Sequence, residues 1–217
     1  MVDAADWDQR YAAADLVWST NPNQFVAAEL ADLPLGRALD AAAGEGRNAL
    51  WLADRGWQVT ALDFSRVGLD KGRALQQGHP RGSELAIDWV HADALTHDTG
   101  PTPYDLVLLA YLQLEADERR TVVRRTFTAL RPGGTFFLVA HDATNLTEGT
   151  GGPSDPAVLF TAEEVLGDLD GERFEVERAE RVARVVPAAH DETDHGHTHR
   201  GEHQRTAYDA LVRVVHT

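Results

Sequence analysis

The stretch Leu39-Asp40-Ala41-Ala42-Ala43-Gly44-Glu45-Gly46-Arg47-Asn48 decides the fold of this chain. This stretch overlaps the end of a short apolar run, Arg37–Ala42. We expect that run to be a strand that ends in small residues. A helix is expected directly afterwards, over Arg47–Arg55, with Gly56 ending it. Small side chains let the backbone of the turn approach a ligand closely. Because ligands of open α/β sheets bind at the carboxyl ends of strands, this turn predicts a ligand site at that edge.

The strand, turn and helix pattern repeats toward the C-terminus. Further strands are expected at Gln58–Leu62, Leu85–Val90, Asp105–Ala110 and Thr135–Ala140, and helices at Val67–Gln77, Glu115–Leu130 and Thr161–Leu169. The apolar run after Asp105 is typical of parallel strands that are covered on both faces. Arg173–Val186 and Arg205–Val215 have no helix between them, which predicts an antiparallel pair. We therefore predict an α/β fold with a Rossmann-like, doubly wound sheet, mostly parallel, closed by an antiparallel hairpin.

The composition excludes several classes of function. The 217 residues carry a formal net charge of −15, which opposes binding to nucleic acids and to anionic membranes. The absence of cysteine excludes disulfides, thiolate metal sites and a cysteine nucleophile. The acidic start MVDAADWDQRY does not look like a signal peptide, and no apolar run is long enough for a membrane span. We expect a soluble, cytoplasmic protein.

Two further acids follow predicted strands. Asp63 ends the second strand, where a carboxylate can accept both ribose hydroxyls of a nucleoside, and Asp93 ends the third, within reach of an adenine amino group. Gly44 to Ala49 also satisfies the G-x-G-x-x-A dinucleotide pattern, so a NAD-dependent oxidoreductase is the alternative. The acids Asp40 and Glu45 beside the turn favour a zwitterionic amino acid with a cationic sulfonium over a diphosphate.

This series of residues resembles the class I S-adenosylmethionine-dependent methyltransferases, strongly so over Arg37–Asp142. One departure is Ala42, which stands at the first glycine of the family pattern D-x-G-x-G-x-G. The resemblance implies that Asp40 lies near the methionine amino group, that Asp63 holds the ribose and that Asp93 contacts adenine. The residues that it implies for cofactor binding are Tyr11, Trp18, Asp40, Ala42, Gly44, Gly46, Arg47, Asn48, Asp63, Phe64, Asp93, Ala94 and Ala110.

Within this class, the sequence is similar to the tellurite-resistance and thiopurine-type branch. The run Arg47–Ala53 (RNALWLA) and the aromatic residues Trp7, Tyr11 and Trp18 carry this likeness. The sequence has no internal repeat and no clear linker, which predicts a single domain, 1–217. Its parts are a helical N-terminal cap (1–36), with a helix expected from Pro22 to about Leu33, a cofactor-binding core (37–142) and a substrate-side half (143–217) that contains a loop at Thr144–Pro156.

The expected reaction is an in-line transfer of the methyl group to a small-molecule acceptor. Tyr111 follows the fourth strand and should meet the reacting methyl, while His141 and Asp142 end the fifth as candidate base and orienter. Arg184 and Arg205 are expected to hold an anionic acceptor. Residues 110–113 (AYLQ) differ from the N-P-P-Y sequence that acts on nucleic-acid bases. We expect no nucleic-acid or membrane partner, and a monomer or homodimer.

A His-rich loop at 190–203 is the most distinctive local feature. His195, His197 and His199 alternate, so an extended chain places them on one side, where they would suit Zn or Ni. Gly196, Gly201 and the lack of apolar anchors favour instead a solvated loop without metal. A metal-responsive binding module is therefore a second, non-enzymatic alternative.

Overall fold

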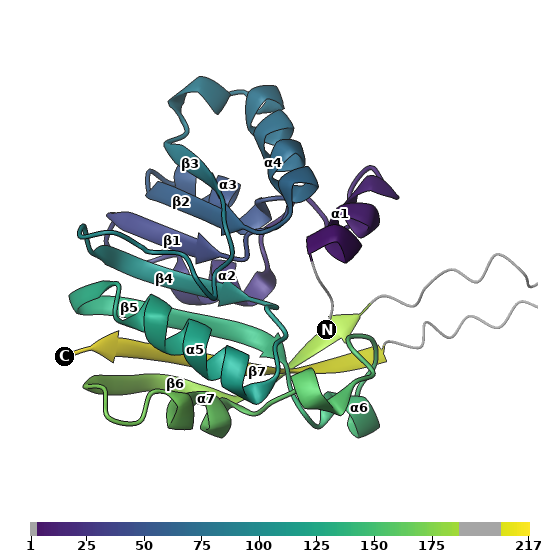
Figure 1. The fold of residues 1–217 in the computed structure, drawn as a ribbon, viewed down its shortest axis with the longest axis vertical. Helices are drawn as coiled ribbons and strands as arrows, with labels where there is room; N and C mark the ends of the chain where they lie inside the picture. The colour runs from purple at the N-terminus through teal and green to yellow at the C-terminus, as the bar shows by residue number, and fades with distance from the viewer. Residues whose placement is uncertain (1–3, 187–204) are drawn as a thin grey trace, which may run out of the picture.

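A computed structural model describes residues 4–186 and 205–217. Its strands are β1 (Arg37–Ala41), β2 (Gln58–Asp63), β3 (Ile87–His91), β4 (Tyr104–Ala110), β5 (Leu130–His141), β6 (Phe174–Val186) and β7 (Arg205–His216). They form one sheet in the order β3-β2-β1-β4-β5-β7-β6 (Figure 1). The first five strands are parallel, and β7 runs antiparallel to both β5 and β6. The predicted Rossmann-like fold with its closing hairpin is confirmed.

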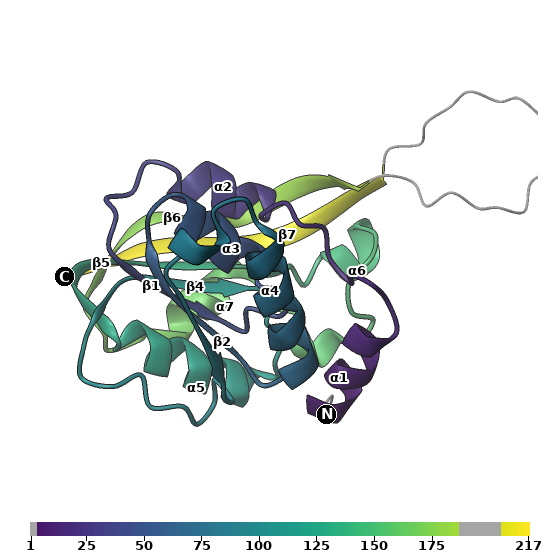
Figure 2. The ribbon, with the colours of Figure 1, turned by 90° about the horizontal axis from the view of Figure 1, so that it is seen from above.

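Helices cover both faces of the sheet. They are α1 (Ala4–Ala12), α2 (Gln24–Leu30), α3 (Arg47–Asp54), α4 (Arg66–Gly78), α5 (Ala116–Phe127), α6 (Asn145–Glu148) and α7 (Ala162–Asp168). Figure 2 shows α2, α3 and α4 on one face and α5 and α7 on the other. In Figure 1, α1 and α6 lie beyond the edge at which β1 and β4 end. Within the described ranges, no helix is long and apolar enough to cross a membrane.

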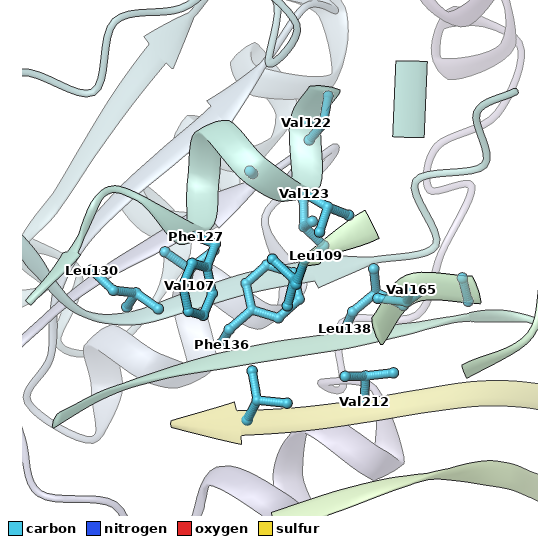
Figure 3. Close-up of a cluster of buried hydrophobic side chains, with 14 of the residues drawn as sticks. Val107, Leu109, Val122, Val123, Phe127, Leu130, Phe136, Leu138, Val165 and Val212 are labelled. Atoms are coloured by element: carbon cyan, nitrogen blue, oxygen red, sulfur yellow. The ribbon is translucent and has the colours of Figure 1, made fainter. Parts of the chain in front are cut away.

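Each face of the sheet has its own apolar core. Phe136 packs with Phe127 and Val165 beneath α5 and α7 (Figure 3), while the next residue, Phe137, packs with Leu52 on the opposite face. This alternation follows from the two-residue period of a strand. Both phenylalanines have no exposed surface, and burial of such a side chain contributes about 1.5–3 kcal/mol. Packing of the two cores fixes where the strands lie in the sheet. It therefore also fixes the edge that their carboxyl ends form.

Several elements differ from the predictions in their bounds. Helix α2 begins at Gln24 rather than Pro22, because the side chain of Asn23 caps it by accepting from Phe25 N at 2.8 Å. The expected loop at 144–156 contains the short helix α6. Strand β5 begins at Leu130 rather than Thr135, since residues 131–134 form an irregularity in its pairing with β4.

Candidate active site

The turn after β1 has a left-handed backbone at Ala42, Gly44 and Gly46, with φ angles of 67°, 57° and 76°. The carboxylate of Asp63 holds this turn, because its Oδ2 accepts from Gly44 N at 2.8 Å. Its Oδ1 accepts from Ser65 N at 2.8 Å. Asp63 is 4% exposed, and burial raises its pKa despite these two bonds. The residue predicted to hold ribose therefore also builds the turn.

Ala42 carries a methyl group in a conformation that L-residues disfavour. The left-handed region costs such a residue roughly 1–2 kcal/mol. We expect Ala42→Gly to raise the free energy of unfolding by about 1 kcal/mol, because glycine adopts this φ without strain. Denaturant unfolding measures the change. The matched control Ala43→Gly, at the neighbouring residue without positive φ, should instead lower stability, and a destabilised Ala42→Gly would contradict the prediction.

Asp40, in β1, is buried at 1% exposure next to this turn. Neither of its carboxylate oxygens has a hydrogen-bond partner among the residues that the structure describes. Burial, with the charge of Asp63 nearby, raises the pKa of Asp40 to about 7, although Arg47 and the backbone amide of Ala49 act in the opposite direction. A buried carboxylate without a partner is costly. Its place beside the turn makes it a receptor for a positively charged or N–H-bearing part of a ligand.

Helix α1 lies across the glycine turn. Tyr11 is 4% exposed, and a Cβ at Gly44 would lie 2.5 Å from the Tyr11 hydroxyl oxygen. The absence of a side chain at Gly44 is therefore what lets Tyr11 rest on the turn. Lys71 of α4 donates from Nζ to the carbonyls of Tyr11 and Ala14, which fixes the end of α1.

Glu45 holds the segment that follows α1. Its carboxylate accepts from Val17 N at 3.1 Å and Trp18 N at 3.0 Å, and it is 2% exposed. Lys71 Nζ lies 3.3 Å from Glu45 Oε1. Glu45 lies beside the turn, as its place in the sequence requires, but its carboxylate binds backbone amides of the cap. Trp18 itself is 36% exposed, and the guanidinium of Arg47 lies 5.6 Å from its ring.

Two other predicted cofactor residues have packing roles. Asn48 is buried, and its Oδ1 accepts from Asn23 N at 2.9 Å, which joins α3 to the start of α2. A Cβ at Gly46 would lie 2.3 Å from the ring of Trp89. These contacts explain by packing alone why Asn stands at position 48 and Gly at position 46, without reference to a ligand.

The residues predicted for adenine lie at the ends of β2 and β3. Asp93 is exposed, and its Oδ1 accepts from Leu95 N at 2.8 Å, so that it caps the turn after β3. Phe64 is half-buried beside Asp63, and its carbonyl contacts His91 Nε2 at 2.9 Å. Ala94 is half-buried against the core under α5.

A second cluster gathers where β4 and β5 end. Tyr111, which follows Ala110, and Arg184 Nε both donate to Asp209 Oδ2 at 2.9 Å. His141 Nδ1 lies 3.3 Å from Asp209 Oδ1. Asp209, in β7, has no exposed surface. The structure thus brings three predicted residues together around a fourth that we did not predict. The available signal was its position on the apolar face of a strand, in register with Ala207 and Leu211.

The charge states within this cluster follow from its contacts. Burial favours the neutral form of Asp209, but the contacts with His141 and Arg184 outweigh it and lower the pKa of Asp209. Burial and the charge of Asp209 raise the pKa of Tyr111, which therefore remains a protonated donor. An anion at Asp209 is thus surrounded by donors.

The predicted pairing of His141 with Asp142 is wrong. Asp142 Oδ1 accepts from the backbone N of Thr144 at 2.9 Å and from its hydroxyl at 2.7 Å, because Asp142 begins the turn into α6. Arg205 is exposed at the first residue of β7, away from the Asp209 cluster. The predicted metal ligands His195, His197 and His199 lie outside the described residues. Among residues 4–186 and 205–217, no group of His, Asp and Glu could hold a metal ion.

Comparison with known proteins identifies a domain type. Residues 38–134 match the family described as methyltransferase domain. The tRNA 5-carboxymethoxyuridine methyltransferase of Escherichia coli K12 is 37% identical over 114 residues, which are 51% of this chain and 42% of that protein. The demethylmenaquinone methyltransferase of Clavibacter sepedonicus is 32% identical over 102 residues, 47% of this chain and 40% of the relative. The match thus spans less than half the length of these relatives.

Solved structures share the fold over most of the chain. TehB from Haemophilus influenzae superposes with a TM-score of 0.69 at 15% identity, covering 99% of this chain and 67% of TehB. The glycopeptide N-methyltransferase MtfA, complexed with S-adenosylmethionine, superposes with a TM-score of 0.60 at 22% identity, covering 88% of this chain and 92% of MtfA.

Proposed function

We propose that this chain is a class I methyltransferase that transfers a methyl group from S-adenosylmethionine to a small-molecule acceptor, and the match of residues 38–134 to a methyltransferase domain supports this proposal. The observation that carries the proposal is Asp40, a buried carboxylate without a partner among the described side chains, set beside a left-handed glycine turn. The family match also favours this activity over the dinucleotide alternative that the G-x-G-x-x-A pattern left open.

The residues at the turn fit this cofactor. Asp40 offers a carboxylate without a side-chain partner to the methionine amino group, and Tyr11 covers the turn at Gly44. When bound, the cofactor supplies an electrophilic methyl group on a cationic sulfonium. The protein's share is mainly to position the acceptor, and positioning can contribute about 7–11 kcal/mol to a bimolecular reaction.

Asp63, Phe64, Asp93 and Ala94 complete the proposed cofactor site. A carboxylate has about four lone-pair positions, so Asp63 can accept from ribose hydroxyls in addition to its two backbone amides. Phe64 and Ala94 offer apolar surface on either side of the ends of β2 and β3 for the adenine, and exposed Asp93 offers an acceptor for its amino group.

The acceptor is proposed to be small on the basis of charge. A net charge of −15 opposes approach of a polyanion, and phosphate contacts supply much of nucleic-acid affinity. The name of the Escherichia coli relative makes tRNA the alternative acceptor. The RNALWLA run and the shared fold with TehB support a place in the tellurite-resistance and thiopurine-type branch.

Calorimetric titration of the dialysed protein with S-adenosylhomocysteine, with NADH as the comparison ligand, tests the cofactor. We expect saturable micromolar binding of S-adenosylhomocysteine, about 8 kcal/mol, and no binding of NADH. Binding of NADH alone, or of neither ligand, would overturn the proposal. Incubation with S-adenosylmethionine labelled in its methyl group, and with either bulk tRNA or a tRNA-free metabolite extract, then distinguishes the acceptors. Label in the tRNA would reject a small-molecule acceptor.

A further inference from the structure

Four strands each contribute one side chain to the cluster around Asp209. Tyr111 follows β4, His141 ends β5, Arg184 belongs to β6, and Asp209 belongs to β7. Tyr111 and Arg184 both bind Oδ2 of Asp209, which leaves Oδ1 facing His141 Nδ1 at 3.3 Å. A fully buried carboxylate needs compensation inside the protein. Arg184 provides the opposite charge, so His141 is not required to stabilise the anion.

Two features indicate more than a structural ion pair. Tyr111 has a φ of 60°, a strained conformation that is uncommon outside functional sites. The side chain of His141 is 15% exposed, and in the described part of the chain neither its Nδ1 nor the facing Asp209 Oδ1 has another hydrogen-bond partner. One imidazole nitrogen therefore faces a buried carboxylate oxygen that no other group engages.

The cluster also adjoins the cofactor turn. Burial lowers the pKa of Arg47, and Tyr111, Asp40 and Arg184 all act electrostatically on its guanidinium. Arg47 is therefore within electrostatic range of both Asp40 and the Asp209 cluster. A proton acceptor at His141 would stand beside the place where the methyl group is transferred.

We propose that Asp209 is a positioning residue that keeps the proton of neutral His141 on Nδ1 and leaves Nε2 free to accept a proton from the methyl acceptor. This inference rests on the proposed function. A carboxylate at one imidazole nitrogen fixes the tautomer and the ring orientation, as in other sites where histidine acts as a base. Tyr111 and Arg184 hold the carboxylate in place from its other oxygen.

This arrangement favours an acceptor whose attacking atom bears a proton. The lone pair of a hydroxyl or amine forms the bond to the methyl carbon, the carbon–sulfur bond breaks with its electrons on sulfur, and the proton passes to His141 Nε2. A halide or a thiolate needs no base. The cluster therefore supports a hydroxyl or amine acceptor.

The groups that face His141 come from neighbouring elements. Asp209 of β7 lies against its Nδ1, Arg184 of β6 binds the other carboxylate oxygen of Asp209, and Tyr111, which follows β4, is a neutral donor. Asp142, next in the chain, faces Thr144 instead. Asp209 is therefore the group whose removal should change the tautomer of the ring.

The test is NMR of the full chain labelled with ¹⁵N-histidine, in which His141→Gln identifies the His141 signals and the ¹⁵N shifts report the tautomer. We expect the Nδ1-protonated tautomer in the wild type. Asp209→Asn should shift the ring toward the Nε2-protonated tautomer, because the carboxylate that accepts from Nδ1 is lost. An Nε2-protonated wild-type ring, or an unchanged tautomer in Asp209→Asn, would overturn the proposal.

Two further variants keep the test decisive if Asp209→Asn fails to fold. Arg184→Gln removes one of the two groups that hold Asp209 Oδ2 and should weaken the preference of His141 for the Nδ1-protonated tautomer. Arg205→Gln, the matched control at an exposed arginine outside the cluster, should leave the tautomer unchanged. An unchanged tautomer in Arg184→Gln would reject the proposal. S-adenosylhomocysteine titration of the same samples separates this outcome from a failure of the proposed function.

Discussion

Asp40→Asn should weaken cofactor binding and at the same time make the free protein more stable above pH 7. The substitution keeps the shape of a side chain that is 1% exposed, but removes the charge that we propose to receive the methionine amino group. A hydrogen bond to a charged group contributes about 1.5–3 kcal/mol, so the affinity for S-adenosylhomocysteine should fall by roughly tenfold to 150-fold. Calorimetry measures this loss.

The stability gain follows from the titration of the buried carboxyl. In the folded protein the pKa of Asp40 rises from 3.8 to about 7, so the folded state retains a proton that the unfolded chain releases. Stability is therefore lost as the pH rises from about 4 to about 7, by an amount on the order of 4 kcal/mol. The amide does not titrate, and the variant should lack this decline.

Thermal unfolding of both proteins between pH 5 and pH 8 checks this expectation. Asp70→Asn is the matched control, because Asp70 is 63% exposed on α4 and its substitution should change neither quantity. Equal affinity in Asp40→Asn and the wild type would show that this carboxylate does not receive the cofactor. A parallel pH dependence of the two melting temperatures would show that Asp40 is ionised in the folded protein.

Glu45→Gln should release the N-terminal segment from the turn. The carboxylate accepts from Val17 N and Trp18 N and pairs with Lys71, while the amide retains the shape but not the charge. Loss of charge-assisted bonds should cost about 2 kcal/mol of cap docking and weaken S-adenosylhomocysteine binding by about tenfold. The two apolar cores do not include Glu45, so cooperative unfolding should change less than the cap does.

Hydrogen exchange at the amides of Val17 and Trp18 measures the docking directly. Exchange there should accelerate in Glu45→Gln, and should stay as in the wild type for Glu84→Gln, whose side chain is 65% exposed at a distant turn. Unchanged protection in Glu45→Gln would contradict the assigned role of this side chain. Faster exchange with full affinity would mean that the cap does not cover the cofactor.

The elements that could be predicted from the sequence are those with local causes. The alternation of apolar runs with glycine turns predicted the parallel sheet, and the pair Thr161 and Glu164 predicted the capping box that begins α7. The glycine turn identified the site because its φ angles and its position after β1 follow from short-range sequence. Periodicity and capping are properties of neighbouring residues.

The site residues that the sequence did not reveal depend on distant contacts. Asp209 acquires its role from Tyr111, Arg184 and His141, which lie far away in the chain and meet only because β7 inserts between β5 and β6. Glu45 adjoins the turn in sequence, but amides from the cap determine where it points. A single sequence carries no signal for either pairing, because both are set by the order of strands and the docking of α1.

The anchor of the cap is also the only lysine among the 217 residues. Lys71 has a side chain that is 22% exposed, and its amine binds the carbonyls of Tyr11 and Ala14. Reagents that modify lysine side chains therefore have one target in this protein, the amine of Lys71 beneath the cap. Acylation, whether by a labelling reagent or as a modification in the cell, would remove the charge of that amine and its hydrogen bonds to the two carbonyls. The added acyl group would then push the cap away from α4.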